Sequence, residues 1–70
     1  MTTTNKMVEI GRGNGSSVQH HYAKRADGQW FVRYQDRSAY GYRWTAWRKC
    51  SAPSTWYADP YLGLARLPKD

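Results

Sequence analysis

The chain has few acidic residues. Five of its 70 residues are Asp or Glu, and only one of these is a glutamate, whereas eleven are Lys or Arg, so the net charge is +6. No two carboxylates have a spacing that indicates a shared acid–base site, and no nucleophile-elbow pattern surrounds a serine. A chain of this length also has little volume for a concave pocket. We therefore predict a protein that is not an enzyme and that carries no cofactor.

Cysteine and long apolar runs are equally scarce. The single cysteine, Cys50, has no partner for an internal disulfide, which favours a reducing, cytoplasmic location. His20 and His21 would point to opposite faces of a strand, so we expect no metal site that joins them to Cys50. No apolar run has the length of a membrane span, and the first residues lack the apolar stretch of an export signal. We expect no membrane partner.

Aliphatic residues are too few to fill a core, so aromatic residues must supply it. Aromatics make up 16% of the chain, and each buries a large apolar body while its polar tip needs a partner. Seventy residues leave no room for a second core. We predict a flexible N-terminal segment at 1–17, with a possible short strand at 7–10 and a glycine-rich loop at 11–17, followed by a single small β-rich domain at 18–70.

The stretch from residue 20 to residue 50 alternates in the manner of β-strands. Asp27-Gly28 is a strong turn signal and predicts a hairpin with arms at 18–25 and 29–35. A third strand is predicted at 40–50, and Pro53 should end the sheet. Asp59-Pro60 is typical of a helix start and predicts a short helix over 61–67. The expected fold class is α+β: a small twisted antiparallel sheet of three or four strands, with a short C-terminal helix or irregular segment on one face.

Strand alternation divides the central stretch into two predicted faces. The even positions are apolar and are expected to turn inward as an aromatic core, comprising Val18, His20, Tyr22, Trp30, Val32, Tyr34, Tyr40, Tyr42, Trp44 and Ala46. The opposite, basic face is expected to meet solvent. A register slip of one residue would exchange the two faces.

The basic face supplies the predicted binding site. The candidate contact residues are Arg25, Phe31, Arg33, Arg43, Thr45, Trp47, Arg48 and Lys49. Arginine suits phosphates and guanine edges because its planar fork pairs in two places, and exposed aromatic rings stack on bases or pack under arginine stems. The alternative interpretation is an ordinary solvated face, where Arg and Lys are common.

The segment DGQWFVRYQDRSAYGYRWTAWRK resembles the three-stranded DNA-binding module at the N-terminus of phage tyrosine integrases (the arm-type module) and in plant AP2-type factors. The residues that match its second strand are Trp30, Val32, Arg33, Tyr34 and Asp36, and Arg43 falls on the third strand. The resemblance implies that the exposed sheet face enters the major groove, with Arg33 and Arg43 as contacts, and that a helix packs behind the sheet. The long helix that follows the third strand in that family is missing here.

Charge, aromatic content and this resemblance predict a non-catalytic nucleic-acid-binding protein of phage or plasmid type, with double-stranded DNA as the favoured partner. The alternative is a small phage- or plasmid-encoded inhibitor or adaptor that binds an acidic host protein, such as a nucleic-acid-processing or defence complex. Trp, Tyr and Arg favour this alternative because they dominate the hot spots of protein interfaces. Either protein would be a monomer or a homodimer.

Overall fold

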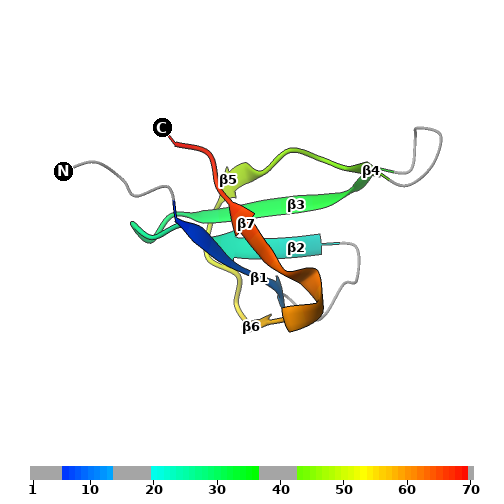
Figure 1. The fold of residues 1–70 in the computed structure, drawn as a ribbon, viewed down its shortest axis with the longest axis horizontal. Coiled ribbons are helices and arrows are strands. Elements are labelled where there is room, and N and C mark those ends of the chain that lie inside the picture. Colours follow the sequence, from blue (N-terminus) through cyan, green and yellow to red (C-terminus); the bar gives the residue numbers. More distant parts are fainter. Residues whose placement is uncertain (1–5, 14–19, 37–42, 70) are drawn as a thin grey trace.

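The computed structural model describes residues 6–13, 20–36 and 43–69, which form one bent antiparallel sheet (Figure 1). Its strands are β1 (Met7–Gly13), β2 (His20–Lys24), β3 (Trp30–Asp36), β4 (Arg43–Trp44), β5 (Arg48–Cys50), β6 (Trp56–Ala58) and β7 (Leu64–Arg66). The expectations for Val18, Tyr40 and Tyr42 and for residues 14–17 of the glycine-rich loop lie outside the described residues.

The α+β fold class is wrong, because the described residues contain no α-helix. The helix start predicted at Asp59-Pro60 is a single 3₁₀ turn, η1 (Pro60–Leu62), in which the Asp59 carboxylate accepts a hydrogen bond of 3.0 Å from the Tyr61 amide. Gly63, at φ +77°, ends the turn, and the chain continues directly into β7. Asp59-Pro60 therefore does begin a helical turn. The turn does not extend into a longer helix because the residues that follow it form β7 and pair with β1. The described part of the protein is a small all-β domain.

The sheet has the strand order β4-β3-β2-β1-β6, and each of two further short strands lies next to β4 or β6 along the same neighbouring strand. β5 pairs with β3 beside β4, and β7 pairs with β1 beside β6. The hairpin predicted around Asp27-Gly28 is confirmed: β2 and β3 pair antiparallel, and Gly28 adopts φ +97° in the turn. In Figure 1, β7 crosses in front of the sheet, so the C-terminal segment covers one of its faces.

The two faces of the β2–β3 hairpin are exchanged relative to the prediction. Alternation is present, but the odd positions face the core, where Ala23 is fully buried and Phe31 is only 2% exposed. Ile10 of β1, Ala65 of β7 and Leu67 complete this core. These aliphatic residues lie outside the central stretch, and they pack on the side where Ala23 leaves room for them. We call this side the core face.

The opposite side carries the even positions of β2 and β3, and we call it the aromatic face. Its rings belong to residues that are half-buried rather than buried, among them Tyr22, Trp30 and Tyr34. Trp56 of β6 lies on it as well, because its indole nitrogen donates a hydrogen bond of 3.1 Å to the carbonyl oxygen of Tyr22. The predicted aromatic core is therefore a partly open surface.

The first strand is longer than the predicted strand at 7–10, because the expected loop does not begin at Gly11. Gly11 and Gly13 belong to β1 and pair with β6. A Cβ atom on Gly11 would lie 2.3 Å from the carbonyl oxygen of Tyr57 and 2.5 Å from the ring of Trp56. Glycine is present here because another backbone and an indole approach closely.

Candidate nucleic-acid interface

A β-bulge divides the third strand that was predicted at 40–50. Gln35 pairs with Trp44 and Val32 pairs with Arg48, so two residues of β3 face three residues of the chain between β4 and β5. Thr45 holds the bulge: its amide donates to the Tyr34 carbonyl (2.9 Å), and its hydroxyl accepts from the Tyr34 amide (3.1 Å). A one-residue insertion of this kind reverses the sides to which the following residues point.

The bulge separates the predicted contact residues. Before it, the register places Trp44 on the core face with Gln35 and Arg43 on the aromatic face with Asp36. After it, Lys49 lies opposite Phe31 and Arg48 lies on the aromatic face. Arg33 and Arg43 therefore lie on opposite sides of the sheet, and the predicted single basic face does not exist.

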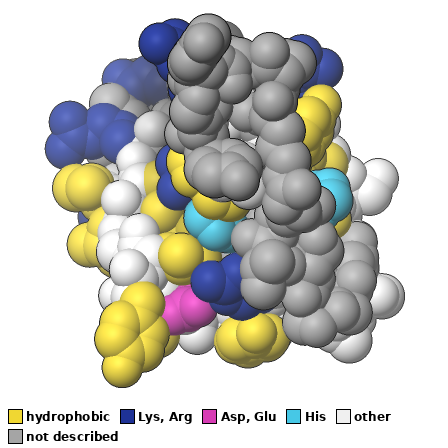
Figure 2. All heavy atoms as spheres, turned by 90° about the vertical axis from the view of Figure 1, so that its right-hand side faces the viewer, with side chains coloured by type: hydrophobic (Ala, Val, Ile, Leu, Met, Phe, Trp, Pro, Cys, Tyr) yellow, Lys and Arg dark blue, Asp and Glu magenta, His cyan; other side chains and the backbone are white. Residues whose placement is uncertain are grey.

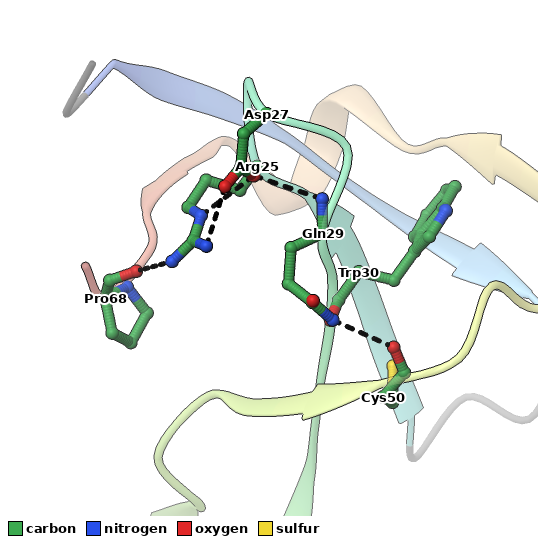
Figure 3. Close-up of polar contacts among 6 residues, drawn as sticks. All are labelled: Arg25, Asp27, Gln29, Trp30, Cys50 and Pro68. Atoms are coloured by element: carbon green, nitrogen blue, oxygen red, sulfur yellow. Dashed lines mark hydrogen bonds and ion pairs between the residues drawn. The ribbon is translucent and has the colours of Figure 1, made fainter. Parts of the chain in front are cut away.

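Arg25 and Phe31 are structural residues of the core face rather than exposed contacts. The Arg25 guanidinium pairs with the Asp27 carboxylate through two hydrogen bonds, of 3.0 and 2.8 Å, and donates a third, of 2.6 Å, to the carbonyl oxygen of Pro68 (Figure 3). Its centre lies 5.2 Å from the centroid of the Phe31 ring. Only 4% of Arg25 is exposed, so it joins the hairpin turn to the C-terminal segment and covers the core. The hydrogen bonds from Arg25 and from the Gln29 amide hold the pKa of Asp27 at about 2.

Arg33 and Trp47 meet in a cluster at the other end of the core face. The Arg33 guanidinium lies 4.7 Å from the Trp47 ring centroid and 5.3 Å from that of Trp44. Its Nε donates to His21 Nδ1 at 3.3 Å, and the His21 ring stacks on Trp44 with centroids 4.0 Å apart. Trp47 also packs against the core. Arg33 is thus half-buried between aromatic rings, a placement in which cation–π contacts strengthen because water is excluded.

His21 is the buried titratable group of this cluster. Burial, then the charges of Arg33 and Arg12, lower its pKa from 6.5 to about 4, and Asp59 opposes this only in part. Arg12 in turn makes an ion pair of 2.8 Å with Asp59, which lowers the pKa of that carboxyl. Figure 2 views this end of the molecule and shows hydrophobic and His side chains around an adjoining basic and acidic pair. At neutral pH the imidazole is uncharged and accepts the Arg33 hydrogen bond.

This geometry predicts a stability that falls on mild acidification. Between pH 6.5 and 4 the unfolded chain binds a proton at His21 that the folded protein does not bind, so the free energy of unfolding decreases as the pH falls, by at most about 3 kcal/mol. Urea denaturation followed by tryptophan fluorescence from pH 7.5 to 4.5 measures the change. The control is H21N, whose amide oxygen still accepts from Arg33, and which should flatten the dependence over this window. An equal slope in both proteins would contradict the assignment.

Three exposed cations lie on the aromatic face, each in a row defined by strand pairing. Lys24 pairs with Trp30, Arg48 lies opposite Val32, and Arg43 lies opposite Asp36. Two of them, Arg43 and Arg48, were predicted as contacts. Lys24 was not among the predicted contacts.

An open pocket of 460 Å³ lies at one end of the aromatic face. It is lined by Met7, Val8, Glu9, Lys24, Trp30 and Trp56. The rings of Trp30 and Trp56 meet edge to face, with centroids 5.6 Å apart, and the Lys24 ammonium lies 5.9 Å from the Trp30 centroid. We call this site the Trp pocket. The high tryptophan content of the sequence favoured an aromatic site of this kind. Nothing in the sequence predicted the contact between Trp30 and Trp56, which are 26 positions apart.

The remaining reactive groups are dispersed. Strand pairing places His20 on the aromatic face beside Tyr34 and His21 on the core face, and burial raises the pKa of the Cys50 thiol. Within the described ranges no three His, Cys, Asp or Glu side chains gather in a way that would hold a metal ion. In the same ranges no helix has the length and apolar character of a membrane span.

No family model matches the chain, and no curated protein or solved structure matches it either. The resemblance to the integrase arm-type module therefore gains no support from these comparisons, and the helix that it implies is not found in the described part of the chain. The function has to be argued from the site itself.

Proposed function

We propose that this chain is a non-catalytic nucleic-acid-binding protein that holds a single strand along the aromatic face. The observation that carries the proposal is the sharing of one surface by half-buried aromatic rings and exposed cations, in the rows Lys24–Trp30 and Val32–Arg48 and in the row of Tyr34. Aromatic platforms flanked by cations are how proteins bind unpaired strands, because each base offers a ring face for stacking. The net charge of +6 supports a polyanionic partner.

Strand geometry favours an unpaired strand over the duplex expected from the sequence. Residues on the same face of a strand recur about every 7 Å. Rings and cations along the aromatic face are therefore spaced so that one could meet each successive nucleotide of an extended single strand. A duplex could form the phosphate contacts, but its bases are already stacked on one another and would not stack on the rings of Trp30 and Tyr34. The protein would act in the cytoplasm, in a phage or plasmid context, as a monomer or a homodimer.

The expected salt dependence tests the proposal. Three phosphate contacts, from Lys24, Arg43 and Arg48, give a slope of log affinity against log salt of about −2 for a single strand. Lys24→Gln and Arg48→Gln should each reduce the slope by about 0.7, whereas Lys69→Gln, an exposed lysine beyond β7, should leave it unchanged. Titration of a mixed-sequence oligonucleotide, followed by quenching of tryptophan fluorescence, provides the measurement. An affinity that is flat in salt would discard the proposal, and tighter binding of the matching duplex would return the preference to double-stranded DNA.

A second candidate function is an inhibitor or adaptor that binds a host protein. Three large apolar side chains from the consecutive elements β6, η1 and β7 are exposed: Tyr57, Tyr61 and Leu64, with Tyr61 97% exposed. Exposed tyrosines supply much of the binding energy of protein interfaces. Capture from nuclease-treated lysate separates the two functions: a stoichiometric protein that is lost with Tyr61→Ser favours the second, and loss of all partners after nuclease treatment favours the first.

A further inference from the structure

We propose that the Trp pocket binds one unpaired guanine base, whose Watson–Crick edge donates hydrogen bonds to Glu9. This inference rests on the proposed function and adds a base preference to it. It concerns a site at one end of the aromatic face, where β1, β2, β3 and β6 each supply a lining side chain.

The shape of the Trp pocket suits a flat ring. Because the Trp30 and Trp56 rings meet at an interplanar angle of 70°, a planar ligand that stacks on one ring meets the edge of the other, and both are favourable aromatic geometries. The volume of 460 Å³ lies within the range of about 300–1,000 Å³ typical of small-molecule sites. Met7, which is half exposed, adds a flexible thioether that can adapt to an aromatic guest.

Trp56 is fixed in place before any ligand binds. Its indole nitrogen donates to the Tyr22 carbonyl, and its ring lies against Gly11, where no side chain intervenes. One wall of the pocket is therefore preorganised, which reduces the entropy lost on binding.

Glu9 is the feature that distinguishes guanine from the other bases. Of the three acidic side chains that the structure describes, Asp27 and Asp59 form ion pairs with arginines, whereas Glu9 forms none. A carboxylate repels the phosphates of a nucleic acid, so at this surface it favours binding only where it accepts hydrogen bonds from a base. Guanine presents an imino and an amino donor side by side, and two carboxylate oxygens accept such a pair.

The other bases lack this adjacent pair of donors. Adenine and cytosine place their amino group beside a ring nitrogen that is an acceptor, and thymine and uracil flank one imino donor with two carbonyl oxygens. In each case the second oxygen of Glu9 would face an acceptor, so only one of the two hydrogen bonds could form.

Lys24 complements Glu9 in the Trp pocket: it pairs with Trp30, and the β1–β2 register continued by one residue places it opposite Glu9. Its ammonium lies 5.9 Å from the Trp30 centroid at the end of a flexible stem, so an incoming base can take its place over the ring while the charge moves to the adjoining phosphate. A guanine nucleotide thus finds an acceptor for its donor edge and a cation for its phosphate within one site.

Oligothymidines of about ten nucleotides, with one central dT replaced by dG, dA, dC or inosine, test the proposal at fixed salt. The dG oligonucleotide should bind about tenfold more tightly than the dT, dA or dC oligonucleotide, since a good bidentate pair discriminates between bases by at least about this factor. Inosine lacks the amino group and should lose most of this gain. Glu9→Gln keeps the size of the side chain and should bring the dG preference below about threefold, while the dT oligonucleotide binds no more weakly because a charge that repels phosphate is removed. Circular dichroism verifies that this variant is folded.

Two further variants separate base selection from general affinity. Lys24→Gln should weaken all the oligonucleotides alike and leave their ratios unchanged, and Lys69→Gln should alter neither. Equal affinities for dG and dA in the parent protein, or an undiminished dG preference in Glu9→Gln, would overturn the guanine site while the proposed function stands. Failure of every oligonucleotide to bind would overturn both.

Discussion

Phe31→Ala is expected to lower the free energy of unfolding by about 4 kcal/mol, because truncating a buried phenylalanine loses its transfer free energy and leaves a cavity. Phe31 is only 2% exposed and lies between Ala23, the other core residues and the guanidinium of Arg25. The loss is comparable to the whole stability of a domain of this size, about 4–10 kcal/mol. Urea denaturation at neutral pH, followed by far-UV circular dichroism, measures it.

Val32→Ala is the matched control for Phe31→Ala. Val32 is the next residue of β3, points to the aromatic face and is half-buried, so its truncation should cost about 1 kcal/mol. Phe31→Leu, which retains most of the apolar volume, keeps the comparison measurable if the alanine variant does not fold. The face assignment made from the sequence requires the opposite order, with Val32→Ala the more damaging, and that result would contradict the structure.

The sequence predicted the alternation of the central strands correctly, but it did not predict which of their two faces is buried. Asp27-Gly28 located the hairpin turn, and alternation correctly placed Phe31 and Val32 on opposite faces. Which face is buried depends on what packs against it, and that material comes from outside the hairpin: Ile10 in β1, and Ala65 and Leu67 near the C-terminus. The aromatic content of the hairpin therefore indicated the wrong buried face. The face that is buried carries Ala23, a small residue against which the other core residues pack.

The prediction of the candidate site was wrong in part because two structural features cannot be read from local sequence patterns. The bulge at Thr45 shifts the register by one residue, so that Trp44 joins His21 on the core face and Arg43 leaves Arg33. The buried Arg25 pairs with the exposed Asp27 and also donates a hydrogen bond to the Pro68 carbonyl, a contact that spans 43 residues of sequence. Arg43 and Arg48 remain exposed, as expected, and contribute to the proposed interface, because neither lies over the core.

Gly11 matters both for the pairing of β1 with β6 and for the position of Trp56 on the proposed interface. The aromatic face can hold the Trp56 ring only because no side chain rises from this position in β1, and the same absence lets the backbone of β6 pair with β1. The packing of β6 against β1 and the proposed binding surface therefore both require the absence of a side chain at Gly11.

Gly11→Ala is accordingly expected to lower the free energy of unfolding by about 3 kcal/mol, at the upper end of the usual cost of overpacking. The added methyl group would lie 2.3 Å from the Tyr57 carbonyl oxygen and 2.5 Å from the Trp56 ring, so β6 must move away from β1. Gly28→Ala is the control: a Cβ there meets no atom within 4 Å, and the cost should be about 1 kcal/mol, from its φ of +97° alone. Urea denaturation compares the two variants, and the tryptophan emission of folded Gly11→Ala should shift to the red as Trp56 gains solvent. If Gly11→Ala were the milder substitution, the close approach of β6 and Trp56 to β1 would be wrong.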